Sequence, residues 1–173
     1  MDPKASIPEQ LCIACGLCCN GVIFADVQLQ PGDDPTTLHA LGVVAKLGAK
    51  TVKIKQPCPA FCGQCKIYSE RPKHCRDFEC ALLKSVEAGH NDLASALRIV
   101  TTAKKRAEKV KRLLRELGET DEKLALSKRF RRVIKRMESQ AFDEESADTY
   151  GQLTLAVHEL NFLLSEAFYP GNE

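Results

Sequence analysis

The sequence predicts an α+β fold that is predominantly α, in which a small loop-rich cysteine module precedes an antiparallel helical bundle. Three observations lead to this prediction. All nine cysteines of the 173-residue chain lie between positions 12 and 80. Two short β-prone runs occur in that stretch, and apolar residues recur at helical spacing from position 91 onward. We therefore place the cysteine module at residues 1–88 and the bundle at residues 89–173, and the two can pack together as one domain.

The cysteine module is expected to contain two strands and one helix. Residues 22–29 are β-prone, and residues 51–55 alternate in polarity as a half-buried strand does. Between them, Asp33-Asp34-Pro35 is a helix-start signal, and apolar residues at helical spacing continue to Gly48. We expect the two strands to pair with each other. In residues 57–80 prolines and cysteines alternate, so we expect the backbone conformation there to be determined by the groups that the thiols bind.

The bundle is expected to contain three helices. The first spans 91–117, opens at Asn91-Asp92 and ends at Gly118. The second opens at Thr120-Asp121 and continues to residue 137, and the third covers residues 143–168. Because the connections are short, neighbouring helices should run antiparallel.

Cysteine usage indicates metal binding rather than disulfide bonding. No apolar run approaches the roughly 18 residues of a membrane span, and the amino-terminus leads into no apolar signal-peptide core. We therefore expect a cytoplasmic protein with no membrane association. In a reducing compartment, clustered thiols bind metal more often than they pair with each other.

Three cysteines at successive x2 spacing, Cys12, Cys15 and Cys18, resemble the segment that iron–sulfur ferredoxins wrap around a 4Fe–4S cluster, with a remote fourth ligand. The adjacent pair Cys18-Cys19 is awkward for one metal because neighbouring side chains diverge. It suits two nearby centres, or one ligand and one bystander. Cysteines further along the chain can supply the missing ligands.

The full pattern is Cys12-x2-Cys15-Gly16-x-Cys18-Cys19, then Cys58-Pro59, then Cys65-x-Ile67-Tyr68-x2-Arg71-Pro72-x2-Cys75-Arg76-x-Phe78-x-Cys80. This arrangement resembles the CxxCxxCC cysteine-cluster family, also called YkgJ-like, whose proteins are described as zinc- or iron-chelating. The resemblance spans about residues 12–80 and leaves the helical tail uncovered. It implies metal chelation by eight thiols: Cys12, Cys15, Cys18, Cys19, Cys58, Cys65, Cys75 and Cys80. Cys62 is not part of the pattern, so it is the expected spare thiol.

An iron–sulfur cluster of the 4Fe–4S type is favoured over zinc, because the triple x2 spacing wraps a cubane better than a single tetrahedral ion. Two classes of role remain open. The favoured one is a non-catalytic redox or metal-binding module. The alternative is an enzyme, an iron–sulfur oxidoreductase or a group-transfer enzyme, since flagellin lysine methylases look similar in the cysteine module.

Charge is distributed unevenly along the chain. Residues 98–136 contain fifteen Lys/Arg and five Asp/Glu, whereas residues 137–173 contain eight Asp/Glu and no Lys or Arg. Helices of opposite sign can complement each other within the bundle. The basic helices over 98–136 also fit an acidic protein partner, and nucleic acid is the least favoured reading. Close to Cys75, Arg71 and Arg76 either compensate thiolate charge and bond loop carbonyls or receive an anion, and His74 is an alternative ligand.

Overall fold

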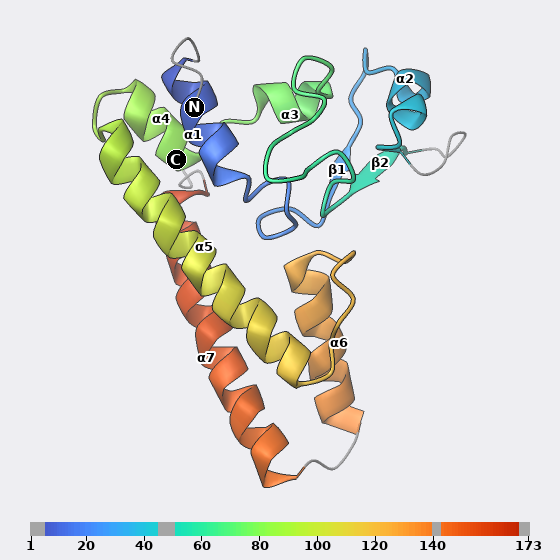
Figure 1. Cartoon of the computed structure of the whole chain (residues 1–173), viewed down its shortest axis with the longest axis vertical. Helices are drawn as coiled ribbons and strands as arrows, with labels where there is room; N and C mark the ends of the chain where they lie inside the picture. Colours follow the sequence, from blue (N-terminus) through green and yellow to red (C-terminus); the bar gives the residue numbers. More distant parts are fainter. Residues whose placement is uncertain (1–5, 45–50, 140–142, 170–173) are drawn as a thin grey trace. The chain divides into compact units, whose positions relative to one another are not determined.

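The computed structural model describes residues 6–44, 51–139 and 143–169 (Figure 1). Within them the chain forms seven helices and two short strands, which confirms the predominantly helical α+β prediction. The chain divides into two compact units. The helical unit comprises Met1–Cys15, Cys80–Asp121 and Leu126–Glu173, and the sheet unit comprises Gly16–Glu79 and Glu122–Ala125. The chain therefore leaves the helical unit after Cys15 and returns to it at Cys80.

The sheet unit is built around an antiparallel pair of strands, β1 (Asp26–Gln28) and β2 (Lys53–Lys55). Val27 lies opposite Ile54 in the register, and both side chains are buried. The expected pairing is confirmed, although each strand has only three residues. The unit also contains α2 (Pro35–Ala40) and α3 (Lys73–Asp77). Its apolar core consists of Val27, Leu38, Val43, Val44, Ile54, Ala60 and Ile67.

Helix α2 is shorter than the sequence predicted. We expected it to reach Gly48, but it ends at Ala40. The reason is Gly42, whose φ of 72° takes the backbone out of the helical region. The amides of Val43 and Val44 then donate to the carbonyl of Leu38, at 2.9 and 3.3 Å, and close the helix end. Residues 45–48 of the expected helix lie outside the described residues.

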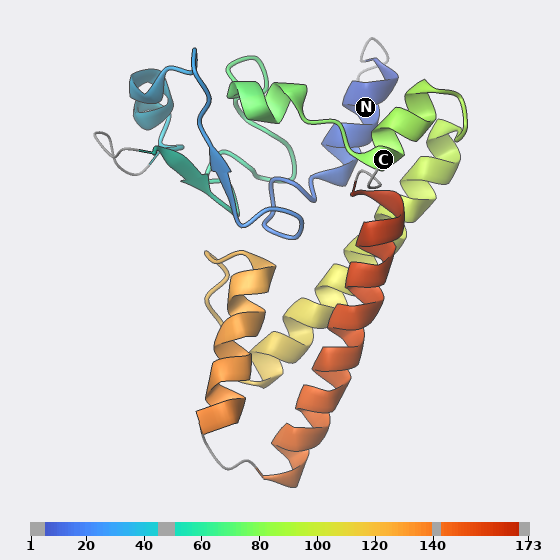
Figure 2. The same ribbon diagram turned by 180° about the vertical axis from the view of Figure 1, so that it is seen from behind.

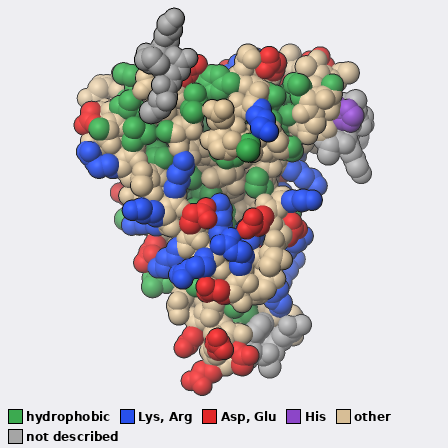
Figure 3. Space-filling model, viewed as in Figure 1, with side chains coloured by type: hydrophobic (Ala, Val, Ile, Leu, Met, Phe, Trp, Pro, Cys, Tyr) green, Lys and Arg blue, Asp and Glu red, His purple; other side chains and the backbone are tan. Residues whose placement is uncertain are grey.

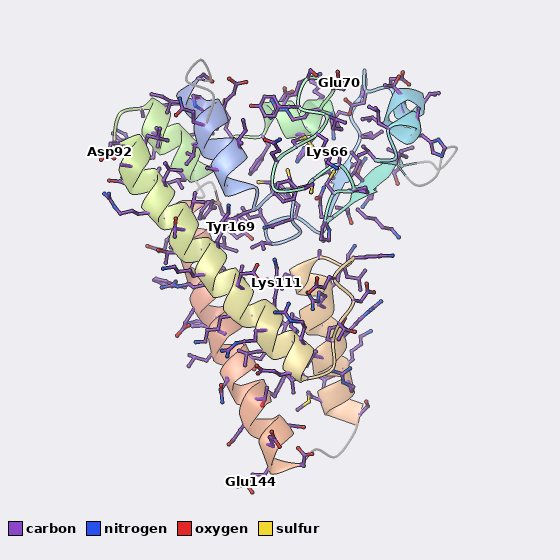
Figure 4. All side chains as sticks on the ribbon, viewed as in Figure 1. Lys66, Glu70, Asp92, Lys111, Glu144 and Tyr169 are labelled. Atoms are coloured by element: carbon purple, nitrogen blue, oxygen red, sulfur yellow. The ribbon has the colours of Figure 1, made fainter. Side chains whose placement is uncertain are left out.

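The helical unit contains α1 (Ile7–Cys15), α4 (Ala81–Glu87), α5 (Leu93–Glu116), α6 (Leu126–Ser139) and α7 (Glu144–Ala167). The long helices α5 and α7 lie side by side in both views (Figures 1 and 2). They run antiparallel, since the labelled Asp92 and Glu144, at the starts of α5 and α7, lie at opposite ends of the pair (Figure 4). The antiparallel arrangement expected for neighbouring helices holds for α6 and α7. It is wrong for α5 and α6, which run in the same direction because residues 117–125 between them lead back along the chain's path before α6 begins (Figure 1). Helices α1 and α4 pack against α5 and against each other.

Local sequence explains where α5 and α7 begin. The Asp92 carboxylate accepts a hydrogen bond from the amide of Ser95 at 2.8 Å, and Asp143 does the same with Ser146 at 2.8 Å. Along α5, small buried residues such as Ala103 allow neighbouring helices to approach closely. In the described part of the chain, no helix combines the length and apolar character needed to cross a membrane.

Helix α6 begins later than the sequence predicted. Thr120-Asp121 was expected to open it, but its first residue is Leu126. The Asp121 carboxylate is bound instead by the guanidinium of Arg132, at 3.0 Å. Residues Glu122–Ala125 belong to the sheet unit. The apparent start signal is thus part of a connection between units.

Candidate metal centre

The nine cysteines are divided between the two units. Cys12, Cys15 and Cys80 belong to the helical unit, where Cys12 and Cys15 lie on α1 and Cys80 precedes α4. The sheet unit contains the other six, which are Cys18, Cys19, Cys58, Cys62, Cys65 and Cys75. Residues 12–80, which the sequence predicted to form one loop-rich module, thus contribute thiols to both units.

Three thiols of the sheet unit lie close together. Cys58, Cys65 and Cys75 all pack, partly buried, against the apolar core of that unit. Burial raises the pKa of the Cys58 thiol, and the nearby Cys65 adds to the effect. Burial, with the charges of Cys58 and Cys65, raises the pKa of Cys75 from 9.0 to about 11. Sulfur atoms are visible beside the labelled Lys66 in Figure 4. The Cys58 and Cys65 thiols are therefore close enough to Cys75 to affect its ionisation.

Backbone hydrogen bonds bring a fourth cysteine to this group. The amide of Cys58 donates to the carbonyl of Cys19 at 2.8 Å. Cys19 itself lies in a turn in which its amide donates to Gly16 at 3.0 Å. The amides of Ala60 and Phe61 act against the burial effect and lower the pKa of Cys58. Backbone amides directed at a thiol favour its anionic form, which is the form that binds metal.

Asp33 positions the helix that carries Cys75. Its carboxylate accepts the amide of Lys73, the first residue of α3, and the amide of Gln30, each at 2.7 Å. Sequence reasoning assigned Asp33 and Asp34 together to the start of α2, but only Asp34 caps that helix. The role of Asp33 joins residues forty positions apart, so no local signal could have revealed it. Its negative charge also contributes to the raised pKa of Cys75.

The Arg71 side chain is held in place by Tyr68, near the Cys75 thiol. Its guanidinium lies 3.5 Å from the centre of the Tyr68 ring, and its Nε donates to the Tyr68 carbonyl at 2.9 Å. The positive charge acts to lower the pKa of Cys75. Of the two roles considered for Arg71, the structure therefore supports charge compensation combined with bonding of a loop carbonyl. Arg76 is exposed.

His74 takes part in aromatic packing. Its ring contacts Phe24 edge-on, with centroids 5.8 Å apart, and stacks on Phe78 at 6.1 Å. Phe24 and Phe78 also contact each other, at 4.9 Å. These contacts account for the position of the histidine ring without a metal.

In the helical unit, the thiols lie at the ends of two short helices that pack together. Cys12 and Cys15 are three residues apart on α1, so they share one face of the helix. Cys80 immediately precedes α4, and burial raises its pKa while the amides of Leu83 and Leu82 oppose the raise. Sequence reasoning missed α1 altogether, because its cysteine spacing was read as a loop.

The chemistry of the donors suits a metal that prefers sulfur, although the thiols are not yet arranged around one point. Within the described residues, no three Cys, His, Asp or Glu side chains form a group that could already hold a metal ion. Apart from the exposed Cys12 and Cys62, the cysteines are partly buried. Backbone amides face Cys58 and Cys80, and Arg71 lies near Cys75, and these features suit thiolate ligands. Binding would require the loss of their protons and a further approach of the sulfurs. The eight-cysteine ligand set remains a prediction.

Comparison with known proteins supports this reading. Residues 11–95 match the CxxCxxCC family model, described as "Putative zinc- or iron-chelating domain". The resemblance seen in the sequence is thus confirmed, and the matched stretch includes all nine cysteines. No curated protein and no solved structure matches the chain.

Beyond the matched segment, several cations of the basic segment form contacts within the helical unit. Arg129 of α6 is buried, and it donates to the carbonyl of Glu119 at 2.8 Å. Arg136 donates to the carbonyl of Leu117. Both arginines therefore fix the connection between α5 and α6. Between α5 and α7, Lys109 forms an ion pair with Glu159 at 3.3 Å, as expected for helices of opposite charge.

Other cations of this segment face solvent. Arg131 and Lys135 are exposed on α6, on the side of the helix opposite its buried residue Val133. Figure 3 shows Lys and Arg side chains interspersed with Asp and Glu side chains over the part of the helical unit built by α5 and α6. The basic segment is therefore partly structural and partly an exposed surface.

Proposed function

We propose that the protein binds iron as an iron–sulfur cluster of the 4Fe–4S type and works as a non-catalytic redox or metal-binding module in the cytoplasm. The observation that carries the proposal is the packing of Cys58, Cys65 and Cys75 against one core in the sheet unit, with the Cys58 amide bonded to the Cys19 carbonyl. Thiolates are the ligands that iron–sulfur clusters use. When bound, such a cluster would take up and release an electron.

The residues of the chain have distinct roles in this proposal. Cys58, Cys65 and Cys75 would hold one centre, with a fourth ligand from the Cys18-Cys19 pair. Arg71, fixed on Tyr68, would offset part of the negative charge that four thiolates bring together. Cys12, Cys15 and Cys80 complete the eight-thiol set. Cys62 lies outside the family's cysteine pattern and stays the proposed spare thiol.

Zinc is the second candidate, and one observation favours it. The sheet unit by itself contains enough cysteines for a four-thiolate site, which is the common arrangement of structural zinc. In that case the metal would stabilise a unit whose two strands are too short to be stable alone.

Anaerobic purification followed by metal and sulfide analysis separates the candidates. A brown protein with iron and acid-labile sulfide supports the cluster. A colourless protein with zinc and no sulfide supports the structural site and contradicts the redox role. Protein free of both metals after reconstitution with each would contradict the proposal as a whole.

The enzymatic alternative has its own test. An enzyme related to the flagellin lysine methylases would need a methyl donor, and an oxidoreductase would need an electron-carrying cosubstrate. Calorimetric titration of the metal-loaded protein with S-adenosylmethionine and with nicotinamide cofactors addresses both. Binding of either cofactor at micromolar affinity would favour an enzymatic role over the non-catalytic module.

We further propose that the exposed cations of the basic segment dock an acidic protein partner. Two kinds of cation on α6 support this proposal. Arg129 and Arg136 donate to backbone carbonyls of the α5–α6 connection, whereas Arg131 and Lys135 are exposed to solvent. Replacing both Arg131 and Lys135 by Glu should abolish retention on immobilised poly-glutamate at physiological salt without lowering the melting temperature. Retention on DNA but not on poly-glutamate would reverse the assignment in favour of nucleic acid.

A further inference from the structure

The carboxyl end of α1 is held by a lysine from another helix of the same unit. The Lys104 ammonium, on α5, donates a hydrogen bond to the backbone carbonyl of Ala14. Helix α1 packs against α5 and has no basic residue in its own last turn. Because the carboxyl end of a helix carries partial negative charge, Lys104 supplies the cation that α1 itself lacks.

The bonded carbonyl lies in the turn that contains both cysteines of α1. Ala14 falls between Cys12 and Cys15, which are three residues apart and share a helix face. A metal would convert both thiols to thiolates and so add negative charge to a helix end that is already negative. A fixed ammonium in the same turn offsets that charge. It also fixes the orientation of the turn from which the two side chains project.

We propose that Lys104 is a positioning residue for the Cys12–Cys15 thiol pair, anchoring the last turn of α1 to α5 and compensating the charge of the two metal-bound sulfurs. This inference rests on the proposed metal-binding function. It assigns a role to a residue beyond the matched family segment, which ends at residue 95. A positioning residue of this kind is invisible in the cysteine pattern.

The chain contains a matched control for this role. Lys105 is the next residue on α5 and is also exposed, but it points to a different side of the helix. The experiment compares the full-length wild type with Lys104→Met, Lys104→Arg and Lys105→Met. Zinc is titrated anaerobically against a chromophoric chelator, and protection of each cysteine from alkylation is measured by peptide mass spectrometry. Far-ultraviolet circular dichroism reports the helical content.

We expect Lys104→Met to require about tenfold more free zinc to protect Cys12 and Cys15, which corresponds to roughly 1.4 kcal/mol. Protection of Cys58 and Cys75, and the helical content, should be unchanged. Lys104→Arg should restore wild-type protection because it keeps both the charge and a donor, and Lys105→Met should match the wild type.

Other outcomes overturn the inference. Equal protection in Lys104→Met and wild type would show that the lysine has no role toward the thiols. Equal losses in Lys104→Met and Lys105→Met would indicate a general charge effect rather than positioning. If Lys104→Arg failed to restore protection, the positive charge at this position would not be what supports the thiol pair. If the wild type protected none of its cysteines with any metal, the proposed function would fail together with the inference, a result distinct from the other three.

Discussion

Replacing Gly16 by Ala tests how the sheet unit brings its cysteine segments together. Gly16 has a φ of 64°, in the region that only glycine adopts easily. A methyl group built on it would lie 2.5 Å from Cζ and 2.8 Å from Cε2 of the Phe61 ring. These distances are well inside the roughly 3.5–4.0 Å at which carbon atoms pack without repulsion. The substitution therefore combines an unfavourable backbone conformation with a steric clash.

The magnitude follows from two contributions. The left-handed conformation costs a non-glycine residue about 1–2 kcal/mol, of which roughly 0.4–1 kcal/mol is returned because alanine restricts the unfolded chain. Overpacking against Phe61 adds about 1–3 kcal/mol, since a half-buried ring can move only in part. We expect the free energy of unfolding of the sheet unit to fall by about 2–4 kcal/mol.

Gly42 provides the matched control. Its φ is 72°, but a methyl group there would have no neighbour within 4 Å. Gly42→Ala should cost only about 1 kcal/mol, the conformational part alone. In the double variant Gly16→Ala/Phe61→Ala the clash disappears, so the two single effects should be non-additive by about 1–3 kcal/mol.

The assay must report on the sheet unit alone. Urea unfolding of the reduced, metal-free protein is followed by pulsed alkylation of Cys58 and Cys75, which are partly buried in that unit, with quantification by mass spectrometry. The reasoning is refuted if Gly16→Ala and Gly42→Ala lose equal stability. It is also refuted if removal of the Phe61 ring leaves the effect of Gly16→Ala unchanged.

Three further predictions concern the thiols directly. Because the Cys75 pKa is raised from 9.0 to about 11 in the folded protein, its thiol ionises at lower pH in the unfolded chain. The free energy of unfolding of the metal-free protein should therefore fall between pH 9 and 11 by up to about 2 kcal/mol. In Cys75→Ala, the urea midpoint should not show this decrease with pH. Arg71→Met should weaken zinc binding about three- to tenfold while Arg71→Lys retains part of it, as measured by chelator competition; equal affinities for all three proteins would exclude charge compensation. Cys62→Ser should retain the full metal content, whereas Cys58→Ser should lose one centre; equal losses would show that the assigned ligand set is wrong.

Sequence reasoning succeeded where structure is local. Helices α5 and α7 were predicted nearly to the residue, because Asp92 and Asp143 cap them and their buried residues recur at helical spacing. It failed where contacts between distant segments determine the local conformation. Helix α1 has only nine residues, and a helix this short is marginal in isolation, so its packing on α5 decides its conformation.

The cysteine pattern revealed the kind of site but not its organisation. Spacing along the chain identified sulfur ligands, and the family resemblance that it suggested is confirmed. The division of the thiols between two units depends on where the chain crosses from one unit to the other, after Cys15 and before Cys80. No spacing rule encodes those crossings. The roles of Asp33 and Lys104 are equally hidden, because each acts on a segment far away in the sequence.

The packing of α1 on α5 determines how far the protein can be shortened. The family segment ends at residue 95, three residues into a helix that continues to Glu116. A fragment cut at that boundary would contain every cysteine but would lack Lys104 and most of the surface on which α1 folds. Its two amino-terminal thiols would then sit on a peptide without a fixed conformation. The smallest piece that preserves the candidate ligands is therefore set by the helices rather than by the last cysteine, and it extends through α7.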